Sequence, residues 1–283
     1  MTEKRKKAII RRRIFISLLA VLLALLTALI AVIVAAVKGG QDNGENNSSV
    51  PFISSQQGET SSDTDADNTS STFTTPTGVT LDTNFKRLLL INADNPLPDD
   101  YDANVRDYLV EIDEGYRNNN NVTQIHSDVY PYITAMVAAA EADGVNLRVW
   151  SPFRSYAVQN DLFQKQVERA GGDEQAAATV VARPGTSEHN TGLCADFNMA
   201  SDTFESTPMY KWMCENAENY GFVLRYPKDK QNVTGVIYES WHWRFVGINT
   251  AKEMNDLGLT LEEYVKLKNI DPASDMYGDD SAK

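Results

Sequence analysis

The sequence predicts an α+β fold in a single domain, with a small central antiparallel sheet and flanking helices. Apolar residues recur with a period of 3.6 in some segments, which is typical of helices, and short β-branched and aromatic runs elsewhere are typical of strands. These segments do not alternate in the regular order of a parallel α/β protein, which favours an antiparallel sheet. The predicted domain covers residues 85–270, enough for one sizeable core, and contains no internal repeat.

The N-terminal part has the pattern of a transmembrane anchor. Residues 14–37 form an apolar run of 24 residues that only Ser17 and Thr27 interrupt, and a helix of that length crosses a hydrocarbon core of about 30 Å. Residues 1–13 hold seven Lys and Arg, which predicts a cytoplasmic basic tail and an exported C-terminal part. A cleaved signal peptide is the alternative, although its apolar region usually has only about 7 to 15 residues.

Composition and charge change after this run. Residues 38–84 are predicted to be a disordered extracytoplasmic spacer, because Gly, Gln, Asp, Asn, Ser and Thr dominate them. The net charge is −13, and residues 1–37 carry +6, which leaves −19 for the remainder, including an acidic tail over 271–283. Phosphate contacts need Lys and Arg, so an exported part this acidic predicts no nucleic-acid partner. The acidity suits solubility.

Helix and strand signals follow one another from residue 127 onward. Ser127 is expected to cap a helix with apolar residues at helical spacing, which Asp143 and Gly144 end. Further helices are predicted over residues 155–170, 173–183, 207–220, 248–256 and 260–268. Strands are predicted over residues 147–151, 192–198, 222–226 and 236–245, the last with a bend.

Two stretches, S-E-H-N-T-G-L-C-A-D and E-S-W-H-W-R, hold most of the chemistry. The chain has only three histidines, and two of them, His189 and His242, lie here close to carboxylates. A loop followed by a strand after Gly192 can turn His189 and Asp196 to one point, and His242 can join them from a neighbouring strand. Two His and one Asp suit zinc, and three protein ligands with one open position are typical of catalytic zinc. Either stretch alone fits ordinary hydrogen-bonded polar residues equally well.

Glu239 precedes His242 by three residues. In an extended and bent segment its carboxylate can reach a water at the open position without binding the metal, and can take its proton. The alternative is an ordinary surface residue of a strand. Trp243 is expected to pack in the core.

Three motifs in this order resemble those of one enzyme family. Arg154-Ser155-Tyr156-x-x-Gln159, S-E-H-N-T-G-L-C-A-D and E-S-W-H-W-R-F are similar to motifs of the zinc D-alanyl-D-alanine carboxypeptidases of the VanY type. That family belongs to a wider group of peptidoglycan peptidases, with D-Ala-D-Ala dipeptidases and L,D-carboxypeptidases. The resemblance includes residues 88–97 and 261–264, and it implies that residues 85–270 are a single zinc-peptidase domain.

The resemblance implies roles for individual residues. His189, Asp196 and His242 match the zinc ligands. Glu239 matches the general base, which afterwards protonates the leaving amine. Arg154 matches the arginine that stabilises the developing oxyanion, as a fixed guanidinium can. The positions that line the substrate pocket are matched by Ser187, Gln159, Tyr226 and Trp241.

Cys194 departs from the family pattern, which usually has a small alanine at this position. It lies two residues before Asp196 on the same predicted strand, so the two side chains share a face. We expect Cys194 to pack, or to form a disulfide with Cys214, the only other cysteine. A thiolate at the metal would compete for the open position and put the reaction in doubt.

Together with the resemblance, the sequence predicts a zinc D,D-carboxypeptidase that hydrolyses the terminal D-Ala-D-Ala bond of peptidoglycan stem peptides. It would be a single-pass protein of the cell membrane with a cytoplasmic N-terminus and an extracytoplasmic domain. The motifs do not separate this activity from an L,D-carboxypeptidase acting on tetrapeptide stems. A non-catalytic, zinc-containing wall-binding module is a different class, which the presence of Glu239 and Arg154 disfavours. A membrane-tethered sensor or scaffold would leave the metal constellation unexplained.

Overall fold

The computed structural model describes residues 71–277, which contain short strands and helices of up to 14 residues. The strands are β1 (Thr72–Thr74), β2 (Thr80–Asp82), β3 (Leu109–Glu111), β4 (Gln124–His126), β5 (Val149–Ser151), β6 (Cys194–Phe197), β7 (Phe222–Leu224) and β8 (His242–Phe245). The α-helices are α2 (Tyr101–Asn104), α3 (Tyr130–Ala142), α4 (Tyr156–Arg169), α5 (Glu174–Ala178), α6 (Pro208–Asn216), α7 (Gln231–Thr234), α8 (Ile248–Leu257) and α9 (Leu261–Leu267).

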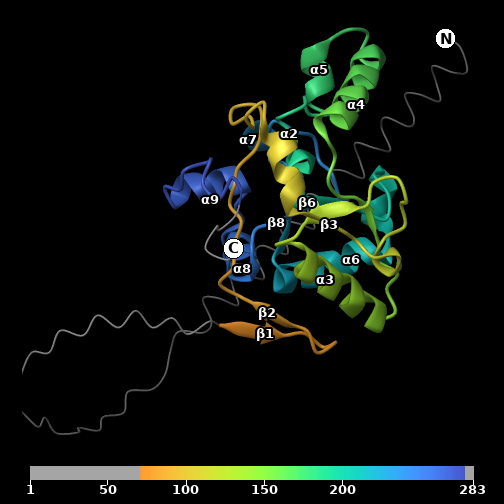
Figure 1. Ribbon diagram of the computed structural model, residues 1–283, viewed down its shortest axis with the longest axis vertical. Coiled ribbons are helices and arrows are strands. Elements are labelled where there is room, and N and C mark those ends of the chain that lie inside the picture. Colours follow the sequence, from red (N-terminus) through yellow and green to blue (C-terminus); the bar gives the residue numbers. More distant parts are fainter. Residues whose placement is uncertain (1–70, 278–283) are drawn as a thin grey trace, which may run out of the picture. The chain divides into compact units, whose positions relative to one another are not determined.

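Four of these strands form the central sheet, in the order β5-β6-β8-β7. Every neighbouring pair is antiparallel, and β1-β2 and β3-β4 form two separate antiparallel pairs. The predicted α+β class with a small antiparallel sheet is therefore confirmed. All described residues lie in one compact unit, and Figure 1 shows α4 and α5 as a pair set apart from the sheet.

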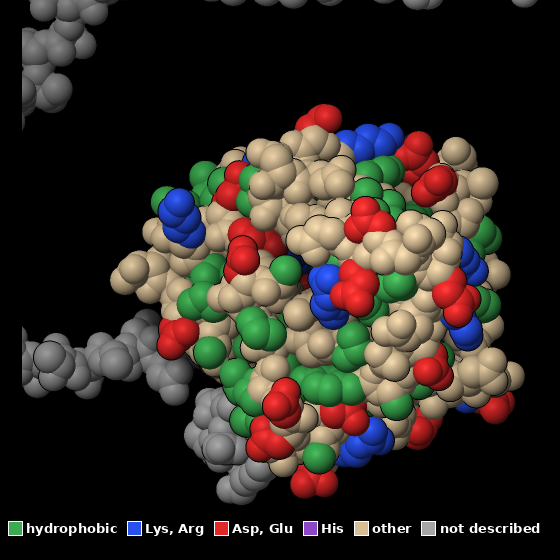
Figure 2. Space-filling model, turned by 90° about the horizontal axis from the view of Figure 1, so that it is seen from above, with side chains coloured by type: hydrophobic (Ala, Val, Ile, Leu, Met, Phe, Trp, Pro, Cys, Tyr) green, Lys and Arg blue, Asp and Glu red, His purple; other side chains and the backbone are tan. Residues whose placement is uncertain are grey.

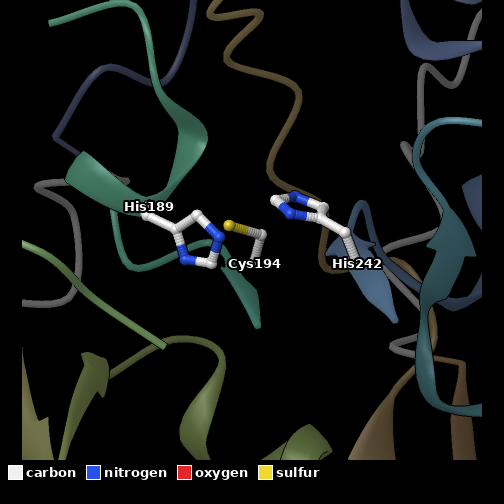
Figure 3. A group of neighbouring side chains, drawn as sticks. All are labelled: His189, Cys194 and His242. Carbon is white, nitrogen blue, oxygen red and sulfur yellow. The ribbon is translucent and has the colours of Figure 1, made fainter. Parts of the chain in front are cut away.

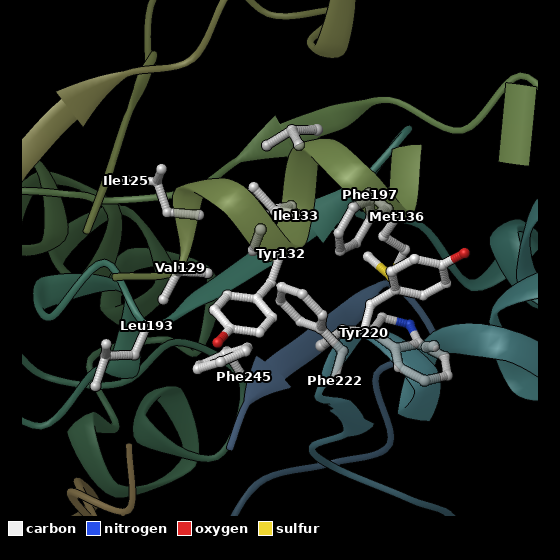
Figure 4. Close-up of a cluster of buried hydrophobic side chains, with 14 of the residues drawn as sticks. Ile125, Val129, Tyr132, Ile133, Met136, Leu193, Phe197, Tyr220, Phe222 and Phe245 are labelled. Atoms are coloured by element: carbon white, nitrogen blue, oxygen red, sulfur yellow. The ribbon is translucent and has the colours of Figure 1, made fainter. Parts of the chain in front are cut away.

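The two faces of the sheet differ because successive side chains of a strand point to opposite sides. Phe197 of β6, Phe222 of β7 and Phe245 of β8 belong to the main hydrophobic cluster and are fully buried. The apolar side of α3 packs against them through residues such as Ile133 and Met136, as Figure 4 shows. The polar residues of these strands alternate with the core residues along the chain, so their side chains lie on the opposite face of the sheet. The candidate site lies on that face.

The helix α3 has the predicted apolar spacing but not the predicted cap. Val129 is its N-cap, without a side-chain hydrogen bond, and Pro131 lies in the first turn. Ser127 lies in a turn before the helix, where its backbone N–H donates to Tyr108 O (2.7 Å). Other helices do have side-chain caps: Ser155 caps α4, and Thr260 and Glu263 form a capping box at α9.

The predicted strand over 236–245 is shorter than expected. Only β8 pairs with its neighbours, and a turn at Ser240 and Trp241 precedes it. The turn is held by Trp243 Nε1, which donates to Ser240 O (3.0 Å), and by His242 N, which donates to Glu239 O (3.4 Å). The predicted helix over 173–183 is likewise reduced to α5, before the loop that leads to the site.

Both ends of the predicted domain extend further than the sequence indicated. The predicted spacer includes residues 71–84, but these form the β1-β2 hairpin, and Leu81 is buried in the main core. Residues 271–277, predicted as part of the acidic tail, are tied to the domain by backbone oxygens: Pro272 O accepts from Leu90 N (2.9 Å) and Met276 O accepts from the Tyr101 hydroxyl (3.1 Å). Local composition cannot reveal such long-range contacts.

Several predictions fall on residues that the structure does not describe. The basic tail 1–13, the anchor 14–37, the first part of the spacer and residues 278–283 lie outside the described residues. Within 71–277, none of the helices combines the length and the apolar character needed to cross a bilayer. On the face of this part shown in Figure 2, acidic and basic side chains are interspersed rather than gathered by sign.

Candidate metal centre

The pairing of β6 with β8 brings the predicted ligands together. Asp196 lies directly opposite His242 in this register, and both side chains are on the polar face of the sheet. His189 reaches the same point from the 3₁₀ turn Glu188–Asn190, which precedes β6. Gly192 joins this turn to the strand at φ +70°, and a Cβ there would lie 2.8 Å from the backbone N of His126. Glycine is therefore required at this bend.

The two imidazoles converge on one carboxylate oxygen. Asp196 Oδ1 lies 3.4 Å from His189 Nε2 and 3.3 Å from His242 Nδ1. His189 Nδ1 lies 2.7 Å from Pro152 O, and because a carbonyl can only accept, Nδ1 carries the proton and Nε2 keeps its lone pair for a ligand. Burial alone would raise the pKa of Asp196, but His189, His242 and Arg154 hold it well below its usual range.

The chemistry of these donors fits a metal ion. Asp196 Oδ1 is buried and has no hydrogen-bond partner among the described residues, which is unusual for a carboxylate in a protein interior. Imidazole nitrogen and carboxylate oxygen are ligands that zinc accepts. His189, Asp196 and His242 therefore could hold a metal ion, and the structure brings together all three predicted ligands.

Glu188, to which the sequence analysis gave no role, lies behind His242. Its Oε2 is 3.6 Å from His242 Nε2, so this carboxylate is placed to accept the outer proton of the ring while Nδ1 faces Asp196. Such an outer carboxylate fixes the tautomer and orientation of a metal-binding histidine. The Glu188 side chain is fully buried.

Two buried arginines neutralise Glu188. Its Oε1 accepts from Arg225 Nε (2.7 Å) and from Arg244 Nη1 (2.9 Å). Arg225 also makes two bonds to Glu262 of α9 (2.8 and 2.6 Å), and Arg244 donates to the backbone oxygen of Leu89 (2.8 Å). Burial alone would raise the pKa of Glu188, but the two guanidinium groups hold it well below its usual range. The network ties the site to α9 and to the N-terminal part of the domain.

Glu239 lies beside the convergence point without joining it. Its Oε2 is 3.6 Å from His242 Nδ1, and its side chain is 13% exposed. Burial raises the pKa of this carboxyl to about 7, against the opposing effect of His242. A carboxylate with a pKa near neutrality is suited to taking and returning a proton. The turn at Ser240 and Trp241 gives Glu239 this position.

Arg154 contacts Asp196 Oδ2, whereas the two histidines face Oδ1. Its Nη2 donates to Asp196 Oδ2 (3.2 Å), its Nη1 to Gln159 Oε1 (2.9 Å) and its Nε to Ser151 Oγ (3.0 Å). Gln159, predicted to bind substrate, is only 1% exposed, and its amide also donates to Ala182 O (2.7 Å). Its place is therefore behind Arg154, where it fixes the guanidinium.

The other predicted pocket residues lie around the same point. The Tyr226 ring is 4.9 Å from the His242 ring, centroid to centroid, and is almost fully buried. Ser187 is buried at the start of the 3₁₀ turn that carries His189. Trp241 is partly buried against the main core, and Trp243 lies in that core as predicted.

Cys194 is fully buried, as expected of a cysteine that packs. Both cysteines are free, so the predicted alternative of a disulfide is wrong. The Cys194 sulfur and one nitrogen each of His189 and His242 lie within 4.8 Å of one another, and Figure 3 shows the cysteine between the two imidazole rings. Burial alone would raise the pKa of its thiol, but the two histidines lower it to about 7. Cys194 is therefore part of the site and does not only pack.

Some site residues that were not predicted could have been found from their neighbours in the sequence. Glu188 is adjacent to His189, and Arg244 follows His242 by two residues and therefore shares its face of β8. Arg225 had a similar signal, since it is adjacent to the predicted pocket residue Tyr226, whereas Glu262 reaches the site from α9 through its bond to Arg225 and had none.

A small antiparallel sheet whose polar face presents two histidines, an aspartate and an adjacent buried glutamate is typical of a metal-dependent peptidase. The family described as "VanY: D-alanyl-D-alanine carboxypeptidase" matches residues 122–248. A D-alanyl-D-alanine carboxypeptidase of Enterococcus faecalis is 38% identical over 185 residues, which are 63% of this chain and 65% of the relative. YodJ of Bacillus subtilis is 37% identical over 191 residues, 65% of this chain and 68% of that protein. The chain belongs to the VanY family, and it spans slightly less than two thirds of the enterococcal relative.

Solved structures agree with this assignment. The structure of VanYB in complex with D-alanine-D-alanine is 37% identical, with a TM-score of 0.54, over 63% of this chain and 97% of that one. A VanY variant in complex with Zn(II) is 36% identical, with a TM-score of 0.52, and 98% of it is covered by 63% of this chain. The L,D-carboxypeptidase LdcB is 34% identical, with a TM-score of 0.53, over 64% of this chain and 86% of that structure.

Proposed function

We propose that this chain is a zinc-dependent D,D-carboxypeptidase that removes the terminal D-alanine from peptidoglycan stem peptides. The proposal rests on the convergence of His189 Nε2 and His242 Nδ1 on Asp196 Oδ1, with Glu239 beside it. This oxygen is buried and has no hydrogen-bond partner within residues 71–277. Membership of the VanY family supports the substrate class, as does the D-alanine-D-alanine held by the related VanYB.

His189, Asp196 and His242 would hold the zinc. When bound, zinc supplies a Lewis acid that polarises the substrate carbonyl and acidifies water. Glu239 takes the proton of the attacking water and returns it to the amine of the departing D-alanine, a task to which its pKa of about 7 is suited. Burial of the site strengthens each of these charge interactions.

Arg154 has two tasks in this proposal. Its bond to Asp196 Oδ2 orients that carboxylate so that Oδ1 faces the imidazoles. A guanidinium has five N–H donors, and the bonds to Ser151, Gln159 and Asp196 use one on each nitrogen. The second N–H groups of Nη1 and Nη2 can therefore serve the substrate oxygen on which negative charge develops.

The test is the substitution Glu239→Gln in the full chain. The variant should retain zinc, because Glu239 is not one of the three proposed ligands, and should release D-alanine from a purified pentapeptide stem about 10²–10⁴-fold more slowly. Glu215→Gln is the matched control, since Glu215 is an exposed residue of α6. Unchanged release by Glu239→Gln would reject the assigned base.

A second candidate, an L,D-carboxypeptidase acting on tetrapeptide stems, is supported by the similarity to LdcB. The hydrolytic residues would be the same, and only the configuration of the residue that precedes the cleaved bond would differ. Pentapeptide and tetrapeptide stems should therefore be digested in parallel and the products weighed. Release of D-alanine from the tetrapeptide but not from the pentapeptide would favour the second candidate.

We propose further that residues 14–37 hold the domain at the outer face of the cell membrane. The apolar run and the basic cluster before it support this topology. The full chain should sediment with membranes and lose its domain to external protease in protoplasts, whereas a chain without residues 1–37 should not sediment. A full chain found in the soluble fraction would argue against the anchor.

A further inference from the structure

Cys194 places a third soft donor in the candidate metal site. It lies on β6, two residues before Asp196 and on the same face of the sheet, and it is 0% exposed. One donor atom each of His189, Cys194 and His242 lie within 4.8 Å of one another. In Figure 3 the cysteine side chain stands between the imidazoles.

Asp196 independently indicates that this space receives a cation. Its side chain is 4% exposed, and Oδ1 has no hydrogen-bond partner among the described residues although it faces both histidines. Pro152 O fixes the tautomer in which His189 Nε2 can donate its lone pair. The cysteine thus lies next to histidine nitrogens that, with Asp196 Oδ1, are already arranged as ligands.

We propose that Cys194 Sγ is a fourth protein ligand, so that this chain holds its metal with two His, one Asp and one Cys. The inference rests on the metal site of the proposed function and adds to it. A closed set of four protein ligands is typical of a structural zinc site, whereas hydrolysis needs a position for water. Cys194 would therefore strengthen metal retention, and it would slow turnover without abolishing it, because zinc can still admit a water by expanding to five ligands.

Cobalt(II) tests the ligation directly, since a thiolate bound to Co²⁺ gives an intense near-ultraviolet charge-transfer band. The full chain loaded with Co²⁺ should show this band, and Cys194→Ala and Cys194→Ser should both lose it. Cys214→Ala is the matched control and should keep it, because Cys214 is the exposed cysteine of α6. Absence of the band from the wild-type protein, or its persistence in both Cys194 variants, would overturn the proposal.

Zinc affinity and turnover separate this inference from the proposed function. Cys194→Ala should weaken zinc binding, measured against a competing chelator dye, by at least about tenfold, because even loss of an outer-shell partner costs about 10–100-fold. It should release D-alanine faster than wild type when zinc is saturating. If neither protein releases D-alanine while the cobalt band behaves as expected, the proposed function fails and the ligation stands. If wild type releases D-alanine but shows no cobalt band, the ligation by Cys194 is rejected and the proposed function stands.

Discussion

Glu188→Gln should damage both metal binding and folding. Glu188 Oε1 accepts from Arg225 and Arg244, and Oε2 faces His242 Nε2 at 3.6 Å. A glutamine has one oxygen and one NH₂ group, so it cannot serve both sides. If the NH₂ faces His242, two donors oppose each other and the ring favours a proton on Nδ1, the atom that must face the metal. If it faces the arginines, three donors meet in a fully buried space.

The magnitudes follow from burial and from the lost charge. Removing one partner of a buried ion pair costs about 3–5 kcal/mol, a large part of the 5–15 kcal/mol that stabilises a typical domain. Loss of the outer carboxylate of a metal-binding histidine costs about 10–100-fold in metal affinity. We expect both losses in Glu188→Gln. The pKa of Glu188 is held below the unfolded value of 4.5, so its contribution to stability is present above pH 4.5 and shrinks as the pH falls below it.

The assay is guanidinium unfolding with the metal removed by a chelator, followed by titration of zinc against a competing dye. Glu262→Gln is the control, because Glu262 binds Arg225 but does not approach His242, and its side chain is 13% exposed. It should lose less stability and keep its zinc affinity. The reasoning is refuted if Glu188→Gln unfolds within about 1 kcal/mol of wild type, or if both variants lose equal zinc affinity.

Three further outcomes are expected. Gly192→Ala should lower the free energy of unfolding by about 1–3 kcal/mol more than Gly258→Ala. Both positions have positive φ, but only an alanine at 192 would press its Cβ against the backbone. Equal losses in denaturant titrations would contradict this. The pKa of the buried His126 is lowered to about 3, chiefly by burial and then by Arg87. Unfolding should therefore become easier by about 1.4 kcal/mol per pH unit as the pH falls below 6.5, and less steeply in His126→Asn; parallel pH profiles would refute the assignment. Arg154→Lys keeps the charge but loses the planar fork, so kcat on a pentapeptide stem, measured at saturating zinc, should fall about 10²-fold. A kcat near that of wild type would exclude the proposed role of Arg154.

Residues close in sequence or repeated at a regular spacing could be predicted from the sequence. Helix α9 has its capping box and apolar spacing within a dozen residues. The helix predicted over 207–220 is found as α6 followed by the 3₁₀ turn Ala217–Tyr220, which Gly221 ends. His189, Asp196 and His242 could be grouped because the chain has so few histidines and because each lies near a carboxylate. The register that sets Asp196 opposite His242 could not be predicted, since strands of four residues carry little information about their partners.

Contacts between distant segments could not be read from the sequence. The hairpin over 71–84 has a polar composition, and contacts with distant segments order it: Leu81 and Phe73 pack against the main core, and Asp82 O accepts from the Tyr132 hydroxyl (2.9 Å). The sulfur of Cys194 was expected to pack, because strand alternation gives the face of a side chain but not the distance to a loop residue such as His189. Arg225 was overlooked because a charged residue in a sequence is normally assigned to the surface.

The buried charges also explain why this site cannot be separated from the stability of its domain. His242 needs an outer acceptor so that Nδ1 stays available, and Glu188 supplies one from a fully buried position. A lone buried carboxylate would be neutralised by protonation, so Arg225 and Arg244 must accompany it, and each of them needs acceptors of its own. Glu262 of α9 and the backbone oxygen of Leu89 provide these acceptors. The orientation of one imidazole thus depends on segments more than 150 residues apart in the chain, so loss of α9 should loosen the metal site before it unfolds the sheet.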